Sequence, residues 1–335
     1  MKNAIDYSPP SHHLDEILFE VKMQEVFSGF KFPDENKVTP VLSKNHLAIV
    51  NQENGEILSV VGRNYKLIKN IEAIEMGKHI FKEIFPQIKT DELIPYKVVA
   101  PASKGSAHID LISKKVNFDV WQQETWLPFL RVSNSYNRTH ALAFEIGFVR
   151  ELCSNGVLFN KKTMKIKYYH VKDRQLHIKN DTEGIKSETD LFARYCKLLS
   201  KIPVPKETMF PLACKILNVN LNPPDRRNLL RKMQQLSTFK ETVDKLTPIY
   251  VKDLGENAYT ALSTVTDVVS HQNAHKIFPG FYLNVRTYYA RPTDWMNDFI
   301  RLNNGGGFEL DGYLKTIFDD LDKLKTTIGF DWREN

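Results

Sequence analysis

The chain has 335 residues, of which 42% are hydrophobic and 26% are charged, with 15 Gly and 16 Pro. This composition excludes a fibrous or disordered chain, and the length suits one large domain or two of ordinary size. The formal net charge of +6 is mild for a protein dedicated to nucleic acid, so the positions of the basic residues matter more than their sum.

The three cysteines, Cys153, Cys196 and Cys214, are widely spaced and form no CxxC pair. An odd number of separated cysteines does not make a disulfide framework, so we expect a reducing compartment. The N-terminal residues show no apolar signal region, and no stretch approaches the roughly eighteen apolar residues that a membrane span needs. The sequence predicts a cytoplasmic protein without membrane contact.

The first 45 residues read as a lead-in, with an amphipathic strand or helix from Leu14 to Phe30. From His46, two apolar runs flank an Asn-Gly step, which predicts a β-hairpin. Apolar residues from Ile71 to Ile84 then recur at helical spacing, and Asn70 is the expected N-cap. This segment predicts a helix lying on a sheet.

Further short runs rich in β-branched and aromatic residues follow, separated by turns, and they predict more strands. From Ser187 onward, apolar residues recur every 3.6 positions, and Pro223-Pro224 marks a helix start. The sequence therefore predicts an α+β fold. A mainly antiparallel sheet domain with a packed helix occupies residues 46–182, and a mainly helical domain occupies residues 183–335.

Three short motifs lie in the central third of the chain, at Val61, Tyr65, Ile68 and Asn70, then Ser135-Tyr136, then Arg150, Cys153, Asn155 and Gly156. With these motifs the chain resembles the domain of unknown function 932 family. The resemblance implies a protein of phages, plasmids or integrated elements, and it implies no activity. The order of strands and helix is also similar to that of single-strand annealing proteins, which is an analogy at the level of the fold.

A basic strip follows the third motif and combines cations with aromatic residues, namely Lys161, Lys162, Lys165, Lys167, Tyr168 and Tyr169. On a strand, Lys165 and Lys167 share a face. In single-strand binders, cations neutralise phosphates and each aromatic ring that stacks a base contributes about 1–3 kcal/mol. A solvated edge hairpin, whose lysines discourage aggregation, explains the strip as well.

A second cluster lies at the tip of a predicted hairpin and on its returning strand, namely Arg131, Asn134, Tyr136, Arg138 and Arg150. Hairpin tips on a rigid sheet are common binding sites. Turn chemistry is the alternative, because asparagines favour turns and Arg150 has acidic neighbours.

Two further features carry the same ambiguity. Asn155-Gly156 reads first as a type I′ turn and second as a backbone nest for an anion. Arg227 and Arg231 lie one helical turn apart and would suit a phosphate backbone, but a solvated helix face accounts for them too.

The sequence has no phosphate-loop, dinucleotide-binding, nucleophile-elbow or paired-carboxylate nuclease motif. His271 and His275 stand at helical spacing without the acid of a zinc protease, and no motif supplies an activating partner for Cys153. We therefore predict no catalytic residue, no metal and no cofactor.

Together these patterns predict a nucleic-acid-binding protein of a mobile genetic element, with single-stranded DNA as the preferred ligand for binding or annealing. An annealing protein would assemble as a homo-oligomer that presents the strip along a groove. The alternative is a protein-interaction module in phage or plasmid defence or counter-defence, without catalysis. Such a module would expose an apolar patch and show no salt-dependent DNA affinity.

Overall fold

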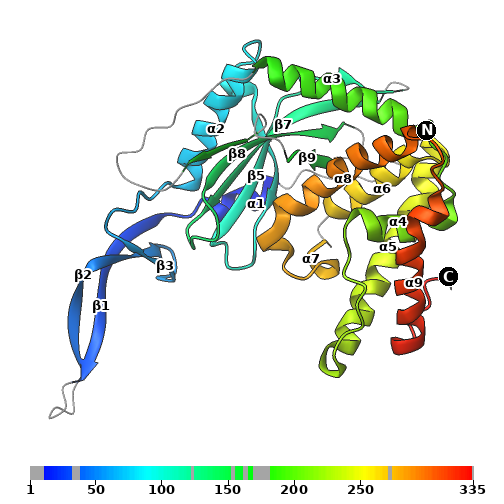
Figure 1. Cartoon of the computed structure of the whole chain (residues 1–335). Helices are drawn as coiled ribbons and strands as arrows, with labels where there is room; N and C mark the ends of the chain where they lie inside the picture. The colour runs from blue at the N-terminus through cyan, green and yellow to red at the C-terminus, as the bar shows by residue number, and fades with distance from the viewer. Residues whose placement is uncertain are drawn as a thin grey trace.

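The computed structural model describes residues 11–31, 38–121, 124–151, 155–160, 165–168, 182–270 and 274–333. Two antiparallel sheets form from the first half of the chain, and most of the helical residues come from the second half (Figure 1). The predicted α+β class is confirmed. Within the described residues, no helix is both long enough and apolar enough to cross a membrane.

A short helix, α1 (Ser11–Ile17), leads into a small three-stranded sheet of β1 (Val21–Lys31), β2 (Val38–Asn51) and β3 (Ile57–Gly62). The predicted β2–β3 hairpin is confirmed, with His46 opposite Gly62. Its turn contains Gly55 at a φ of 74°, a conformation that favours glycine. The expected boundary between residues 45 and 46 falls inside β2.

Among the described residues, the large sheet has seven strands, and its main path runs β10-β8-β7-β5-β4. Short strands β6 and β9 pair with β7 and β8 respectively. Its members are β4 (Ile94–Val99), β5 (Ser106–Ile112), β6 (Phe118–Asp119), β7 (Thr125–Ser135), β8 (Leu142–Arg150), β9 (Gly156–Leu158) and β10 (Lys165–Tyr168). All of these pairings are antiparallel. In this order, β10 and β4 form the two edges of the main path.

Helices cover both faces of the large sheet. The remaining elements are α2 (Asn70–Ile84), η1 (Thr90–Glu92), α3 (Thr182–Leu199), η3 (Lys206–Thr208), α4 (Met209–Ile216), η4 (Arg226–Asn228), α5 (Leu229–Leu254), α6 (Ala258–Ser270), α7 (Ala274–Ile277), α8 (Phe281–Asn304) and α9 (Leu310–Ile328). Helix α2 packs closely on β7, because a Cβ on Gly77 would lie 2.6 Å from a Val132 methyl. The next residue back, Arg131, faces Tyr289 of α8 on the opposite side.

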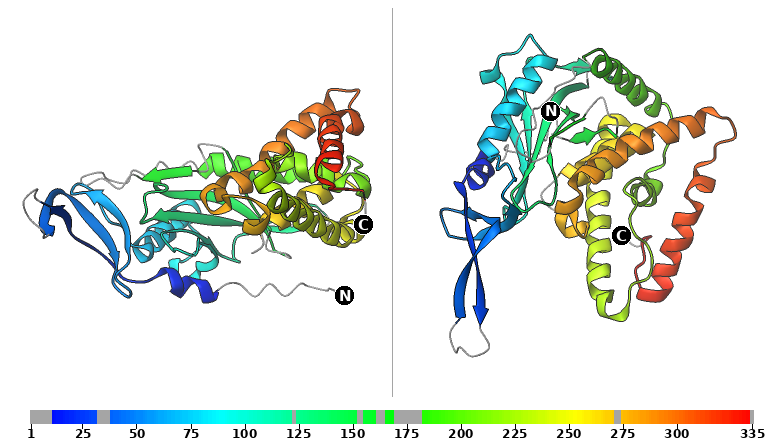
Figure 2. Two further views of the ribbon diagram at one scale, coloured as in Figure 1. Left: turned by 90° about the horizontal axis from the view of Figure 1, so that it is seen from below. Right: turned by 60° about the vertical axis from the view of Figure 1, so that its left-hand side comes forward.

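One large hydrophobic cluster contains residues of the large sheet, of α2 and of the C-terminal helices. The two predicted domains, which were expected to meet at residue 182, therefore share this cluster. A second, small cluster consists of Phe19, Val21, Ile49, Val61 and Tyr136. It lies where the small sheet meets the large one. The outer parts of β1 and β2 extend beyond it, away from the body of the protein, and the projection is visible from all three directions (Figures 1 and 2).

Candidate nucleic-acid interface

Tyr136 of the predicted hairpin tip anchors the small sheet to the large one. Its hydroxyl accepts a hydrogen bond from the Asn70 backbone N–H at 2.8 Å, and its backbone oxygen accepts one from Ser59 on β3 at 2.7 Å. Its ring meets Phe19 edge to face. Tyr136 is buried, and burial raises the pKa of its hydroxyl. The prediction that Tyr136 stacks a base is therefore wrong, because its ring is already packed.

Two buried asparagines complete this junction. Asn134 donates to the backbone oxygen of Ile68 at 3.0 Å and to Asn70 Oδ1 at 2.9 Å. Asn70 in turn donates to the backbone oxygen of Ile17 at 2.7 Å. The predicted ligand contact of Asn134 and the predicted N-cap role of Asn70 are both wrong, since Lys69 occupies the N-cap position. Both amides instead link α1 and α2 to β7.

Arg131 forms a buried ion pair and does not reach the surface. Its Nε and Nη2 atoms each donate to an Asp110 carboxylate oxygen at 2.7 Å. Its guanidinium carbon lies 3.9 Å from the centroid of the Tyr289 ring. Burial opposes the charge, but Asp110 outweighs it and raises the pKa of Arg131. The predicted nucleic-acid contact is wrong because the guanidinium is fully buried between Asp110 and Tyr289 of α8.

The described residues of the third motif are also structural, and Cys153 lies outside the described residues. Buried Arg150 pairs with Glu124 rather than with its neighbours in sequence, and its Nη2 lies 2.5 Å from Glu124 Oε1. Asn155 is buried too, and its side-chain amide donates to the Tyr250 hydroxyl at 2.7 Å and to the backbone oxygen of Ser263 at 3.2 Å. Neither Asn155 nor Gly156 has a positive φ, so the predicted type I′ turn is wrong. These residues hold the sheet against α5 and α6, and none of them lies on an exposed surface.

The described part of the basic strip is largely engaged within the fold. Lys165 is paired with buried Glu145 at 2.6 Å, and the Glu145 carboxylate also accepts from Arg286 of α8 at 2.5 Å. Tyr168 is buried, and its hydroxyl lies 3.4 Å from Lys66 Nζ. Lys161, Lys162 and Tyr169 lie outside the described residues, as does the side chain of Lys167. Lys165 and Tyr168 therefore contribute to the edge of the sheet rather than to an open groove.

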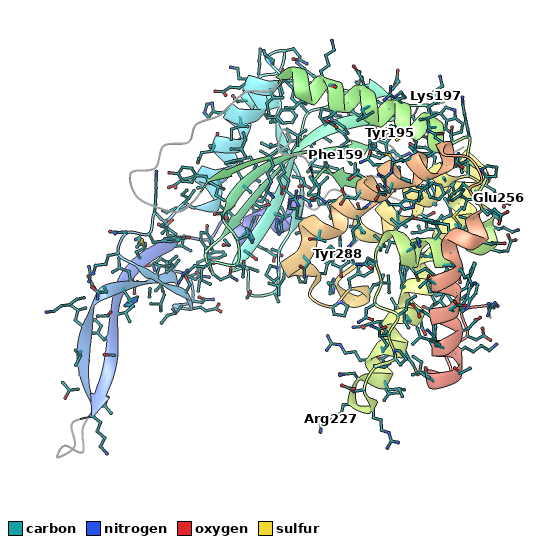
Figure 3. All side chains as sticks on the ribbon, viewed as in Figure 1. Phe159, Tyr195, Lys197, Arg227, Glu256 and Tyr288 are labelled. Atoms are coloured by element: carbon teal, nitrogen blue, oxygen red, sulfur yellow. The ribbon has the colours of Figure 1, made fainter. Side chains whose placement is uncertain are left out.

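Three of the predicted cations are exposed. Arg138 has a φ of 63° and donates to the backbone oxygen of Val60 at 3.4 Å, so it lies beside the base of the small sheet. Arg227 lies in η4, directly before α5, and Arg231 lies in the first turn of α5, next to exposed Leu230. Figure 3 shows Arg227 at the end of α5 that points away from the sheet. The structure therefore does not bring Arg227 and Arg231 together with the basic strip, whereas Arg138 lies in the turn before Leu142, the residue opposite Tyr168.

A β-ribbon that the sequence interpretation did not single out exposes several large hydrophobic side chains. We call residues 25–31 of β1 and 38–46 of β2 the arm. Phe27 is 60% exposed and stands directly opposite exposed Leu42 on β2. Val38, on the same face, is 64% exposed and stands opposite Lys31. Aromatic, aliphatic and cationic side chains therefore share one uncovered face.

The arm also carries Lys44, which is exposed, and Lys22 is exposed next to its base. The acid of the arm's described part, Glu25, is paired with Arg63 of the adjoining loop at 2.7 Å. Arg63 also donates to the backbone oxygen of Lys44 at 2.5 Å. With Glu25 paired to Arg63, the exposed cations of the described arm are Lys31 and Lys44, while Asp34, Glu35 and Lys37 lie outside the described residues. The sequence does contain a signal for this surface. In residues 21–31, hydrophobic and polar side chains alternate irregularly, so both faces of the strand carry hydrophobic side chains.

Comparison with known proteins gives one result. A family model described as a domain of unknown function, DUF932, matches residues 57–304, which is more than half of the chain. No curated protein and no solved structure matches. The matched region contains β3, the large sheet and the helices up to α8, whereas β1 and β2 precede it.

Proposed function

Because the chain belongs to the DUF932 family, which is defined without an activity, we propose a function from its exposed surface: the arm binds single-stranded nucleic acid. The observation that carries the proposal is the exposed Phe27, which lies between the exposed lysines Lys31 and Lys44 on a ribbon that no other described element covers. Exposed rings stack unpaired bases, and lysines neutralise the phosphates on either side. In a duplex the bases are already stacked on one another, so single strands are the preferred ligand.

The cations of the arm and its base account for the expected path of the strand. Lys31 and Lys44 lie on the two strands of the arm, and Lys22 and Arg138 lie near its junction with the large sheet. A strand that follows the ribbon would meet a cation at several points along its length. Arg227 on η4 and Arg231 on α5 would contribute only if the strand also reached the helical end of the molecule.

Fluorescence anisotropy of a labelled single-stranded oligonucleotide at two salt concentrations tests this proposal. Phe27→Ala should weaken binding by about 1–3 kcal/mol, which is about five- to 150-fold. Lys31→Glu/Lys44→Glu should weaken it further and lower the salt slope, by about 0.7 for each phosphate that the variant no longer neutralises.

The matched control is Lys82→Glu/Lys252→Glu, which makes the same change of charge at exposed lysines on α2 and α5. It should bind the oligonucleotide almost as the wild type does. If the control loses as much affinity as the arm variant, the binding reflects net charge and the arm has no special role. If the wild type does not bind at low salt, the nucleic-acid proposal fails.

A protein-interaction module is the second candidate, and the apolar side chains of the arm favour it. Phe27, Val38 and Leu42 are all exposed, and such a patch is typical of a surface that binds another protein. The anisotropy experiment separates the two functions, because a protein-binding arm would show no salt-dependent affinity for the oligonucleotide.

The cellular setting is also part of the proposal. Cys196 and Cys214 are free and buried, which supports a reducing compartment such as the cytoplasm. Annealing within a mobile genetic element would further require copies of the chain side by side on one strand. Sedimentation of the protein with and without oligonucleotide tests this assembly, since an annealing protein should sediment as an oligomer on the strand.

A further inference from the structure

A cavity of about 360 Å³ lies at the β4 edge of the large sheet. Its walls come from α1, from β4 with the residues that follow it, and from the end of α6, α7 and the first turns of α8, which can be followed in Figure 1. The volume falls at the lower end of the range for small-molecule sites. The cavity is separate from the arm, because none of its lining residues belongs to β1 or β2.

One end of the cavity carries a lysine. Lys97 lines it and donates from Nζ to the backbone oxygen of Ser270. The same ammonium lies 5.5 Å from the ring centroid of Tyr289. Glu16 also lines the cavity, but it is paired with Lys104 at 3.1 Å. The lining therefore leaves a positive charge for a ligand to neutralise.

Tyr289 supplies a second polar group at this end. Its side chain is only 1% exposed, and its hydroxyl interacts with the nearby Lys97 ammonium, although no described residue makes a hydrogen bond of normal length to it. Burial acts to raise the pKa of Tyr289, but the charges of Lys97 and Arg131 outweigh it and lower the pKa. An anionic oxygen beside Lys97 would accept its hydrogen bond.

The other wall is aromatic and apolar. The rings of His275 and Tyr282 stack with centroids 5.5 Å apart and planes 24° apart. Val98, Val99 and Phe281 add apolar surface around them. A planar ring fits such a wall, because it can stack on Tyr282 while its edge remains near the exposed His275.

We propose that this cavity binds a nucleoside monophosphate, with the phosphate at Lys97 and Tyr289 and the base against Tyr282 and His275. The nucleotide is either free in solution or the terminal nucleotide of a strand. The second source rests on the proposed function of the arm, whereas the first does not. The cavity would then give the protein a site for one nucleotide in addition to the surface that follows the strand.

Isothermal titration calorimetry of the full chain with AMP, GMP, CMP and UMP tests the site. At least one of these nucleotides should bind, and Lys97→Gln and Tyr282→Leu should each weaken it about tenfold or more. Lys252→Gln removes an exposed lysine far from the cavity lining and should change nothing. If Lys97→Gln fails to fold in a thermal melt, Tyr289→Phe removes only the hydroxyl and should weaken binding about fivefold.

Three results would overturn the proposal. The first is a folded wild-type protein that binds none of the four nucleotides at millimolar concentration. The second is equal affinity in the wild type and in both Tyr282→Leu and Tyr289→Phe. The third is inorganic phosphate binding as tightly as the nucleotides, because the aromatic wall would then have no part in binding.

Two further measurements separate the sources of the nucleotide. If the cavity holds a strand end, a labelled oligonucleotide with a terminal phosphate should bind more tightly than the same strand without it, and the free nucleotide should compete. If it holds a free nucleotide, neither effect should occur. Phe27→Ala on the arm should weaken strand binding and leave nucleotide binding intact, so failure of the arm proposal can be told from failure of this one.

Discussion

Asp110→Asn should destabilise the protein more than an ordinary polar substitution. The Arg131 side chain is 0% exposed and that of Asp110 is 4% exposed, and two hydrogen bonds of 2.7 Å join them. The substitution keeps the shape of the side chain but leaves a guanidinium charge uncompensated in the interior. Breaking a buried pair in this way costs about 3–5 kcal/mol, which is a large share of the roughly 5–15 kcal/mol that stabilises a folded protein.

Urea unfolding followed by tryptophan fluorescence measures this cost as a shift of the midpoint at constant slope. Asp298→Asn is the control, since it breaks an exposed pair with Arg301 and should leave the midpoint unchanged. The double variant Asp110→Leu/Arg131→Met removes both charges and should recover most of the stability that Asp110→Asn loses. A loss below about 1 kcal/mol in Asp110→Asn, or a double variant less stable than the single one, would refute the assignment of a desolvated pair.

Three other substitutions probe the fold that supports the two sites. Gly147→Ala should prevent stable folding, because its Cβ would come within 3.0 Å of a backbone oxygen and an aromatic ring; soluble yield and a thermal melt measure this. Tyr136→Phe leaves the Asn70 N–H of the first helical turn unpaired and should cost about 1–3 kcal/mol in urea, with faster proteolysis of the arm. Burial and nearby positive charges lower the pKa of His108 well below 6.5, so the unfolded chain binds a proton that the folded chain does not. The contribution of His108 to the free energy of unfolding should therefore be complete above about pH 6.5. Below that pH, the free energy of unfolding should decrease by up to about 1.4 kcal/mol per pH unit. The wild type and the exposed-site control His79→Gln should show this decrease, and His108→Gln should not.

The sequence predicts the elements well because their patterns are local. The Asn-Gly step between two apolar runs gives the β2–β3 hairpin, and the spacing of apolar residues gives α2. These signals depend on a few neighbouring residues and on the period of the strand or helix. They require no knowledge of what packs against the element.

The predicted site could not be placed by the same means. Alternation along β7 shows that Arg131 points away from Val132, but it does not show that this side faces solvent. Helix α8, about 150 residues later in the chain, covers that face and places Tyr289 on the guanidinium. The polar residues of strand β7 therefore read as a binding surface in the sequence and form a buried network in the fold.

The family match sharpens the distinction between the two proposed sites. Residues 57–304 include Lys97, Tyr282 and Tyr289 of the cavity, as well as Tyr136, which holds the small sheet in place. The strands of the arm lie before residue 57. An activity found in another member of the family would therefore bear on the cavity first, because the matched region contains nearly all of its walls. Such an activity would not apply to the arm unless that family member also had a β-ribbon like β1 and β2. Strand binding therefore has to be measured on this chain and on its Phe27 variant.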